Sequence, residues 1–259
     1  MNIVVCVKYV PDAQADRTFS AEDNTTDRDG VDGLLSELDE YAVEEALKLA
    51  EASDGKVTAL TVGPDDASDA VRKALQMGAH EAVHVVDDAI HGSDYLATSK
   101  ILAAALGKLE YDLVLTGMAS TDGVGGVVPA MLAERLGLPQ VTLASELTVE
   151  DGKATIRRDN DASTEIVEAA LPAVISVTDQ INEPRYPSFK GIMAAKKKPL
   201  QTWDLDDLGL SAEEVGLGAA SSAVQTVAAR PARTAGEVVT DAGDGGTKLV
   251  EFLAGAKLV

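Results

Sequence analysis

The chain has 259 residues, of which 46% are apolar and only 3% aromatic, and its formal net charge is −21. This length accommodates one large α/β domain, alone or with an appendage, with a core built mainly from Ala, Val and Leu. The acidic excess argues against nonspecific binding to nucleic acid or to an anionic membrane surface.

The N-terminal half alternates short apolar runs with longer amphipathic segments. The run Ile3 to Val7 is rich in β-branched residues and predicts a buried parallel strand. Residues 12–33 are polar and predict a loop or a weak hairpin, and Asp66 is the expected N-cap of the second helix. Strands are predicted at 3–7, 56–62, 82–86 and 113–116, and helices at 39–52, 66–77, 93–106 and 127–136, the last three followed by Gly78, Gly107 and Gly137. This alternation predicts a parallel sheet with helical crossovers.

The pattern changes after Pro139. Two runs, 141–149 and 153–158, flank Asp151-Gly152, which is a hairpin signal, and 173–177 is another apolar strand. Beyond Asn182 only residues 247–253 show a clear helical pattern. A stretch this long without periodicity is uncommon inside a compact domain. We therefore expect an α/β domain over residues 1–181 and an extended arm over 182–259 that packs on another chain.

Localisation follows from what the sequence lacks. No run approaches the roughly 18 apolar residues of a membrane span, and the first apolar run has no basic region before it, so we expect neither membrane insertion nor a signal peptide. The single cysteine, Cys6, excludes an internal disulfide and fits a reducing interior. We expect a cytoplasmic protein. The dispersed acids fit either an ordinary solvated surface or a high-salt cytoplasm, and the low aromatic and lysine content favours a halophilic source.

The loop from Gly117 to Val128 is the strongest site candidate. It joins a predicted strand to a predicted helix, where ligands bind in open α/β sheets. Four glycines let backbone N–H groups approach an anion, and Asp122 can instead hydrogen-bond a ribose or an adenine edge. Neither the GxGxxG nor the phosphate-loop motif is present, so a glycine-rich connection without a ligand stays open.

Other junctions are expected at the same end of the sheet. They are residues 7–12, 36–39 and 62–64, with Cys6 on the adjoining strand as a small buried residue rather than a redox centre. The three histidines are scattered and no ligand spacing completes a metal site. No Ser-His-Asp or paired-carboxylate motif supports catalysis.

Seven stretches are distinctive as a set: VKYVPD (7–12), DEYAVEEALKL (39–49), ALQMGAHEAVHV (74–85), DLVLTGMASTDG (112–123), AERLGLPQVT (133–142), LPAVISVTDQINEPRYPSFKGIMAAKKKP (171–199) and RTAG (233–236). Together they resemble the beta subunit of electron-transfer flavoprotein, in family order over nearly the whole chain. The resemblance implies an adenine-nucleotide-hydrolase-like α/β domain and a heterodimer with an alpha subunit that holds most of the redox FAD. It further implies an electron carrier without a catalytic residue of its own, passing electrons from acyl-CoA dehydrogenases or related dehydrogenases to a membrane quinone oxidoreductase.

The same resemblance implies a structural AMP in the beta subunit, or a second FAD there in electron-bifurcating members. Asp122 matches the family's acid, while Ser36-Glu37 replaces an Asn-Pro pair of AMP-type members. Asp122-Gly123 and Val128-Pro129 lean toward the bifurcating pattern, but the Asp-Thr of that pattern is missing, so the ligand stays open. The implied cofactor-binding residues are Cys6, Ser36, Glu37, Leu38, Asp39, Val62, Gly117, Met118, Ala119, Ser120, Thr121, Asp122, Gly123, Val124, Gly125, Gly126, Val127 and Val128.

Residues 182–199 match a loop that docks on the partner dehydrogenase. Phe189 takes the place of the apolar anchor, which would enter a pocket on the partner, and the lysines supply positive charge. A solvated helix end is the alternative for this segment. Glu165, opposite Arg158, would contact the alpha subunit's flavin domain, or form a surface cross-strand pair. The implied partner-binding residues are Arg185, Tyr186, Pro187, Phe189, Ile192, Met193, Lys196, Lys197, Lys198 and Glu165.

A stand-alone nucleotide-binding stress-type protein is the alternative of a different class. Such proteins share the α/β architecture but are much shorter and usually form homodimers. They leave residues 182–199 and the C-terminal arm without a role, and co-purification with a second, flavin-bearing chain distinguishes the two.

Overall fold

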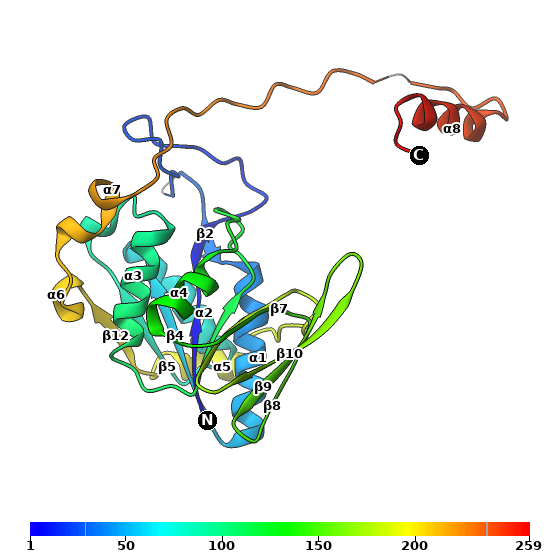
Figure 1. Ribbon diagram of the computed structural model, residues 1–259. Helices are drawn as coiled ribbons and strands as arrows, with labels where there is room; N and C mark the ends of the chain where they lie inside the picture. The colour runs from blue at the N-terminus through cyan, green and yellow to red at the C-terminus, as the bar shows by residue number, and fades with distance from the viewer. Residues whose placement is uncertain (29, 237) are drawn as a thin grey trace. The chain divides into compact units, whose positions relative to one another are not determined.

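A parallel sheet organises the chain, for which a computed structural model describes residues 1–28, 30–236 and 238–259. Seven strands of the described residues form this sheet, in the order β12-β5-β4-β1-β6-β11-β7 (Figure 1). Every neighbouring pair is parallel. The strands are β1 (Asn2–Cys6), β4 (Lys56–Val62), β5 (Glu81–Val85), β6 (Leu113–Gly117), β7 (Gln140–Ala144), β11 (Ala173–Val177) and β12 (Leu200–Trp203). The predicted α/β fold is confirmed.

Helices cover both faces of this sheet. Along β1, Ile3 and Val5 belong to one buried cluster and Val4 and Cys6 to the other, because successive strand side chains point to opposite faces. The first cluster includes the apolar stripes of α1 and α2, and the second those of α3 and α4. Burial on both sides explains why β1 is a continuous apolar run rather than an alternating one. The helices are α1 (Glu37–Ser53), α2 (Ser68–Met77), α3 (Tyr95–Leu106) and α4 (Val128–Leu136).

Most helix ends match the sequence prediction, with one exception. Gly78 and Gly137 end α2 and α4 at positive φ angles of 146° and 64°, which glycine adopts without steric cost. The predicted N-cap at Asp66 is wrong. Asp66 lies in a preceding 3₁₀ turn, η1 (Asp65–Ala67), and Ala67 occupies the N-cap position of α2.

An antiparallel sheet follows β7. It contains β8 (Glu146–Glu150), β9 (Lys153–Asp159) and β10 (Thr164–Ala170), and Figure 1 shows the β9–β10 hairpin extending away from the parallel sheet. The predicted hairpin turn is confirmed, since Asp151 and Gly152 both have positive φ, 50° and 73°, between paired Glu150 and Lys153. The single strand expected over 141–149 is divided near Ser145, where the chain leaves one sheet for the other.

A long loop connects the first strand with α1. Two short strands, β2 (Tyr9–Pro11) and β3 (Gly33–Leu35), pair antiparallel and close the loop at its base. An isolated bridge joins Phe19 to Thr26 within it. The expected loop or weak hairpin over residues 12–33 is therefore a long loop whose two ends are held together by the β2–β3 pair.

The chain forms two units, residues 1–225 and 226–259. The first extends past the boundary expected at residue 181, because β12 pairs with β5 and because Leu205 and Val215 are buried in the core. Short elements carry this part of the chain: α5 (Phe189–Ala195), α6 (Leu205–Leu208), η3 (Ala212–Glu214) and α7 (Gly216–Ala219). In the second unit, α8 (Gly245–Gly255) contains the helix predicted over 247–253.

Within the described parts of the chain, each helix is too short or too polar to cross a bilayer.

Candidate functional site

Asp39, in the first turn of α1, joins the ends of two adjacent strands. Its carboxylate accepts hydrogen bonds from the backbone N–H of Lys8, at 2.8 Å, and of Gly117, at 3.2 Å. A Cβ atom at Gly117 would lie 2.5 Å from Asp39 Oδ1, so only glycine permits this approach. The predicted site residues on α1, after β1 and after β6 therefore meet at one edge of the sheet.

Asp39 is buried, and burial raises its pKa to about 7 although the two backbone N–H groups oppose the shift. Its neighbour Ser36 is fully buried at the start of α1, but its side chain does not cap the helix. Ser36 Oγ and Thr121 Oγ1 are buried without a hydrogen-bond partner among the residues that the structure describes. Unpaired buried hydroxyl groups are costly, and a bound polar ligand would satisfy them.

Asp122, in the glycine-rich loop, is held by two cations. Its carboxylate lies 2.9 Å from Lys8 Nζ and 2.8 Å from Arg28 Nη2, and its side chain is only 3% exposed. Burial by itself would raise the pKa of Asp122. Lys8, together with hydrogen bonds from Ser120, Lys8 and Arg28, instead holds the pKa well below its usual range.

The glycine-rich loop is shaped from outside by further side chains. The Tyr95 hydroxyl donates to the carbonyl oxygen of Gly123 at 2.7 Å, and a Cβ at Gly125 would lie 2.4 Å from the Tyr95 ring. Arg17 donates to the carbonyl oxygens of Thr121 and Asp122. These contacts fix the backbone of the loop, whose N–H groups are the donors that the sequence analysis assigns to an anion.

The other predicted site residues lie along the same edge. Cys6 ends β1 in the core, and burial raises the pKa of its thiol to about 12, which makes it an inert small residue. Val62 ends the neighbouring strand β4. Glu37 and Leu38 belong to the first turn of α1, with Glu37 exposed. Val128 begins α4, directly after the loop.

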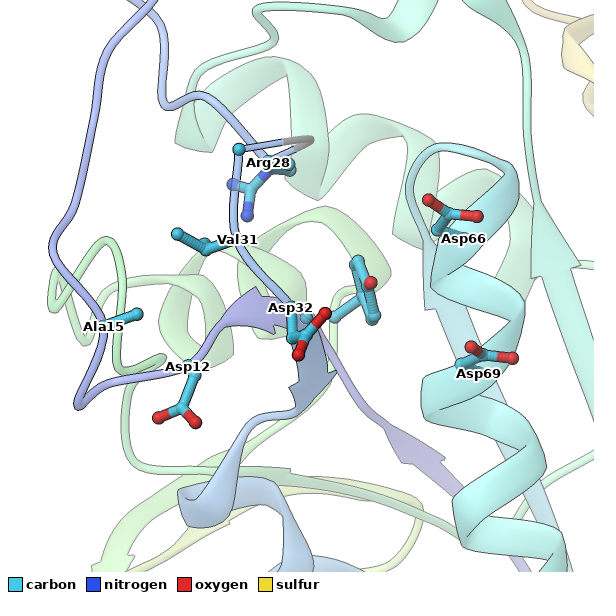
Figure 2. A pocket seen from close by; sticks show the side chains of 10 residues that line it. Asp12, Ala15, Arg28, Val31, Asp32, Asp66 and Asp69 are labelled. Atoms are coloured by element: carbon cyan, nitrogen blue, oxygen red, sulfur yellow. The ribbon is translucent and has the colours of Figure 1, made fainter.

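A pocket of about 920 Å³ is lined by the long β2–β3 loop and by residues of η1 and α2 (Figure 2). None of the predicted cofactor-binding residues lines it. Arg28, which also holds Asp122, is the cation in its wall. The described residues that line it are Tyr9, Asp12, Ala15, Arg28, Gly30, Val31, Asp32, Gly33, Asp66 and Asp69.

The three histidines have separate local partners. His80 Nδ1 accepts from the Val57 N–H at 3.1 Å, His84 Nε2 lies 3.1 Å from the Gly63 carbonyl oxygen, and His91 pairs with Asp23. The described residues contain no group of three or more His, Cys, Asp or Glu placed to hold a metal ion.

The segment 182–199 is fastened to the helices beneath it. Arg185 pairs with Glu44 at 2.7 Å and with Glu51 at 2.6 Å, both on α1. Lys198 Nζ donates to the carbonyl oxygens of Leu75 and Ala79 at the C-terminal end of α2. Two of the cations assigned to partner binding therefore hold the segment on its own chain.

Apolar side chains of the same segment face solvent. Tyr186 is 92% exposed and Phe189 is 80% exposed, and Ile192 and Met193 on α5 are also exposed. The Ser188 side chain caps α5 by accepting from the Gly191 N–H at 3.0 Å. This exposed patch and the exposed lysines Lys196 and Lys197 are free to meet another molecule, and their partner role stays a prediction.

Glu165 and Arg158 face each other across β10 and β9, with 3.2 Å between Glu165 Oε2 and Arg158 Nη1. Arg158 also donates to the Thr142 carbonyl oxygen. The surface cross-strand pair, one of the two roles expected for Glu165, is therefore present. The other role, contact with the alpha subunit, stays a prediction.

Comparison with known proteins gives the family. The electron transfer flavoprotein domain matches residues 23–208. Relatives named electron transfer flavoprotein subunit beta, from Mycobacterium leprae and Mycobacterium tuberculosis, are 51% and 50% identical, covering 100% of this chain and 99% of their own length. This chain belongs to the electron transfer flavoprotein beta-subunit family. The resemblance stated from sequence motifs is confirmed.

Within this family one relative carries a more specific name. Subunit CarD of the caffeyl-CoA reductase-Etf complex from Acetobacterium woodii is 38% identical over 93% of this chain and 92% of its own length. The domain match spans the glycine-rich loop and the segment 182–199 but starts after β1.

Sequence reasoning missed four residues that build the site of this beta-subunit family member. Lys8, Arg17, Arg28 and Tyr95 contact the glycine-rich loop across separations of 28 to 114 residues. Lys8 was within reach of a local argument, because it follows β1 directly. The other three lie in loops or at a helix start, where no periodicity marks them.

Proposed function

We propose that this chain holds an adenine nucleotide at the carboxyl edge of β4, β1 and β6. One observation supports this proposal most: buried Asp39, the unpaired hydroxyl groups of Ser36 and Thr121, and a glycine-rich loop come together at this edge. These groups fit an adenylate, which offers hydroxyl and ring nitrogen partners for the hydroxyls and an anion for the backbone N–H groups. AMP is the proposed ligand.

As a beta subunit, the chain would form half of a heterodimer whose alpha subunit holds most of the redox FAD. That flavin supplies the electron chemistry, and this chain supplies a scaffold, without a catalytic residue of its own. Electrons would pass from acyl-CoA dehydrogenases to a membrane quinone oxidoreductase. The exposed patch on α5 would dock the dehydrogenase, and residues 226–259 would pack on the alpha subunit.

FAD in the same site is the second candidate. The pairs Asp122-Gly123 and Val128-Pro129, which lean toward the pattern of electron-bifurcating members, support it. In that case the complex would belong to the electron-bifurcating members of the family, with the adenylate half of the FAD held as proposed for AMP.

The cellular compartment and its salt content are also proposals. We infer a cytoplasmic protein from the single buried thiol. The formal charge of −21 supports a high-salt interior, where a carboxylate-rich surface stays hydrated and soluble.

Co-expression with an alpha subunit tests the proposed function. We expect a yellow heterodimer whose flavin is reduced by an acyl-CoA dehydrogenase in the presence of its substrate. A colourless homodimer of this chain, without flavin or a second chain, would support the stand-alone nucleotide-binding alternative instead.

A further inference from the structure

Three cations outside the family-derived site converge on Asp122. Lys8 and Arg28 contact its carboxylate, and Arg17 donates to its carbonyl oxygen at 3.0 Å. Lys8 follows β1, whereas Arg17 and Arg28 come from the long loop between β2 and β3. Two positive charges, those of Lys8 and Arg28, therefore meet the single negative charge of the Asp122 carboxylate.

Arg28 is incompletely paired where it stands. Its Nη2 donates to Asp122 at 2.8 Å, but its Nη1 is buried and has no acceptor among the described residues. A guanidinium group presents its donors as a planar fork that matches a phosphate or carboxylate with two oxygens. One prong of this fork is therefore satisfied and the other is available.

The pocket of about 920 Å³ lies next to Arg28. Arg28 forms part of its wall, as Figure 2 shows, and its Nη2 contacts Asp122, which is not among the lining residues. Four aspartates, Asp12, Asp32, Asp66 and Asp69, also line the pocket. Their charges disfavour a free anion there, so an anion would need the additional binding of an attached nucleoside.

We propose that Lys8 and Arg28 form the phosphate subsite of the nucleotide site, and that Asp122 occupies this subsite as an internal substitute for phosphate. Binding of a nucleoside phosphate exchanges the carboxylate of Asp122 for a phosphate group on the two cations. A phosphate dianion matches the two positive charges of Lys8 and Arg28, whereas an uncharged nucleoside does not. This inference rests on the proposed nucleotide site and adds two residues that the family resemblance did not assign.

The test is the ratio of two affinities, measured by isothermal titration of the full-length chain with AMP and with adenosine. The wild-type chain should prefer AMP by tenfold or more. Arg28→Gln should lower this preference about tenfold, through the affinity for AMP, and leave the affinity for adenosine unchanged. The ratio is taken within each variant, so a general loss of stability cancels.

Two further variants sharpen the result. Arg157→Gln removes another carboxylate-paired arginine, which lies on β9 and contacts Glu146 and Asp159, and it should change neither affinity. Asp122→Asn removes the competing carboxylate and should preserve or increase the preference for AMP. If Arg28→Gln does not fold, Arg28→Lys, which keeps the charge but loses the fork, should give an intermediate ratio.

An unchanged ratio in Arg28→Gln would overturn the inference while leaving the nucleotide site in place. So would a ratio in Asp122→Asn that falls as far as in Arg28→Gln, because Asp122 would then bind the ligand itself. Absence of binding of both AMP and adenosine to the folded wild-type chain would overturn the proposed nucleotide site and not only this subsite.

Discussion

At the scale of single residues, Asp39 shows how a site is prepared at the cost of stability. Its carboxylate receives two backbone N–H groups from separate strand ends, yet it is buried beside Cys6 and Asp122. Burial disfavours the ionised form and raises the pKa of Asp39 to about 7. The same group therefore organises three segments and remains a source of destabilisation at neutral pH.

The stability of the nucleotide-free chain should consequently fall as pH rises from 5 to 8. Between the ordinary pKa of a carboxyl group and about 7, the folded chain binds a proton at Asp39 that the unfolded chain releases, so its stabilising effect is lost with rising pH. Urea unfolding should show a decrease on the order of 2 kcal/mol from this group. The decrease should disappear in Asp39→Asn and persist in Asp69→Asn, a control at an exposed position on α2. An identical slope in wild type and Asp39→Asn would contradict the assignment.

The ion pairs of Arg185 show how burial sets the contribution of an ion pair to stability. Its two partners differ, because the Glu44 side chain is 9% exposed and that of Glu51 is 61% exposed. Glu44→Gln should destabilise the chain by about 1–3 kcal/mol, since it removes charge from a partly desolvated pair that also binds the Arg185 N–H. Glu51→Gln should cost less than about 1 kcal/mol. Thermal unfolding of both variants measures which substitution costs more stability. Equal losses of stability in Glu44→Gln and Glu51→Gln would show that burial does not decide the strength of the ion pair.

At the scale of elements, one side of α5 and its flanking residues is held against α1 and α2, and the other side faces solvent. Arg185 and Lys198 hold the segment to α1 and α2, and a Cβ at Gly191 would lie 2.6 Å from the Gln76 carbonyl oxygen. The exposed side carries Phe189 and Met193. A rigid mount with an apolar anchor loses little conformational freedom on binding, which favours a small docking surface.

Phe189→Ala should therefore slow flavin reduction by the partner dehydrogenase about 10- to 100-fold in kcat/KM, without changing heterodimer formation or flavin content. Phe19→Ala, an exposed phenylalanine in the long loop, serves as the matched control and should leave the rate unchanged. Stopped-flow measurement of flavin reduction distinguishes them. A Phe189→Ala rate equal to that of wild type would remove the anchor role.

The elements also show where sequence reasoning succeeds and where it stops. Local patterns predicted the long helices, the parallel strands and the Asp151-Gly152 turn, because periodicity and turn conformation are local properties. They missed β12, α6 and α7, since elements of four residues show no period. The candidate edge of the sheet was predictable from the strand–loop–helix order. Lys8 could be placed at this edge because it follows β1, but its contact with Asp122 and that of Arg28 were not predictable, because they span 114 and 94 residues.

At the scale of the whole molecule, charge is the dominant property. A formal charge of −21 produces self-repulsion that salt reduces. Screening alone is nearly complete by about 1 M salt, where the Debye length is about 3 Å. If the chain is adapted to a high-salt interior, its melting temperature should continue to rise with KCl above that concentration. A plateau below about 1 M would indicate ordinary screening and would argue against the halophilic proposal.

The whole chain also presents apolar surface in its second unit. Leu249, Val250 and Phe252 of α8 are exposed within residues 226–259. Such exposed apolar surface is typical of a segment that another chain covers. It fits the proposal that this unit packs on the alpha subunit of the heterodimer.

The central claim is that this chain binds an adenine nucleotide separate from the flavin of its partner. The most direct test is to purify the heterodimer, denature it and identify the released ligands by mass spectrometry with quantification per complex. We predict one FAD from the alpha subunit and, in addition, one AMP or a second FAD. A complex that releases one FAD and no further adenine nucleotide would contradict the account.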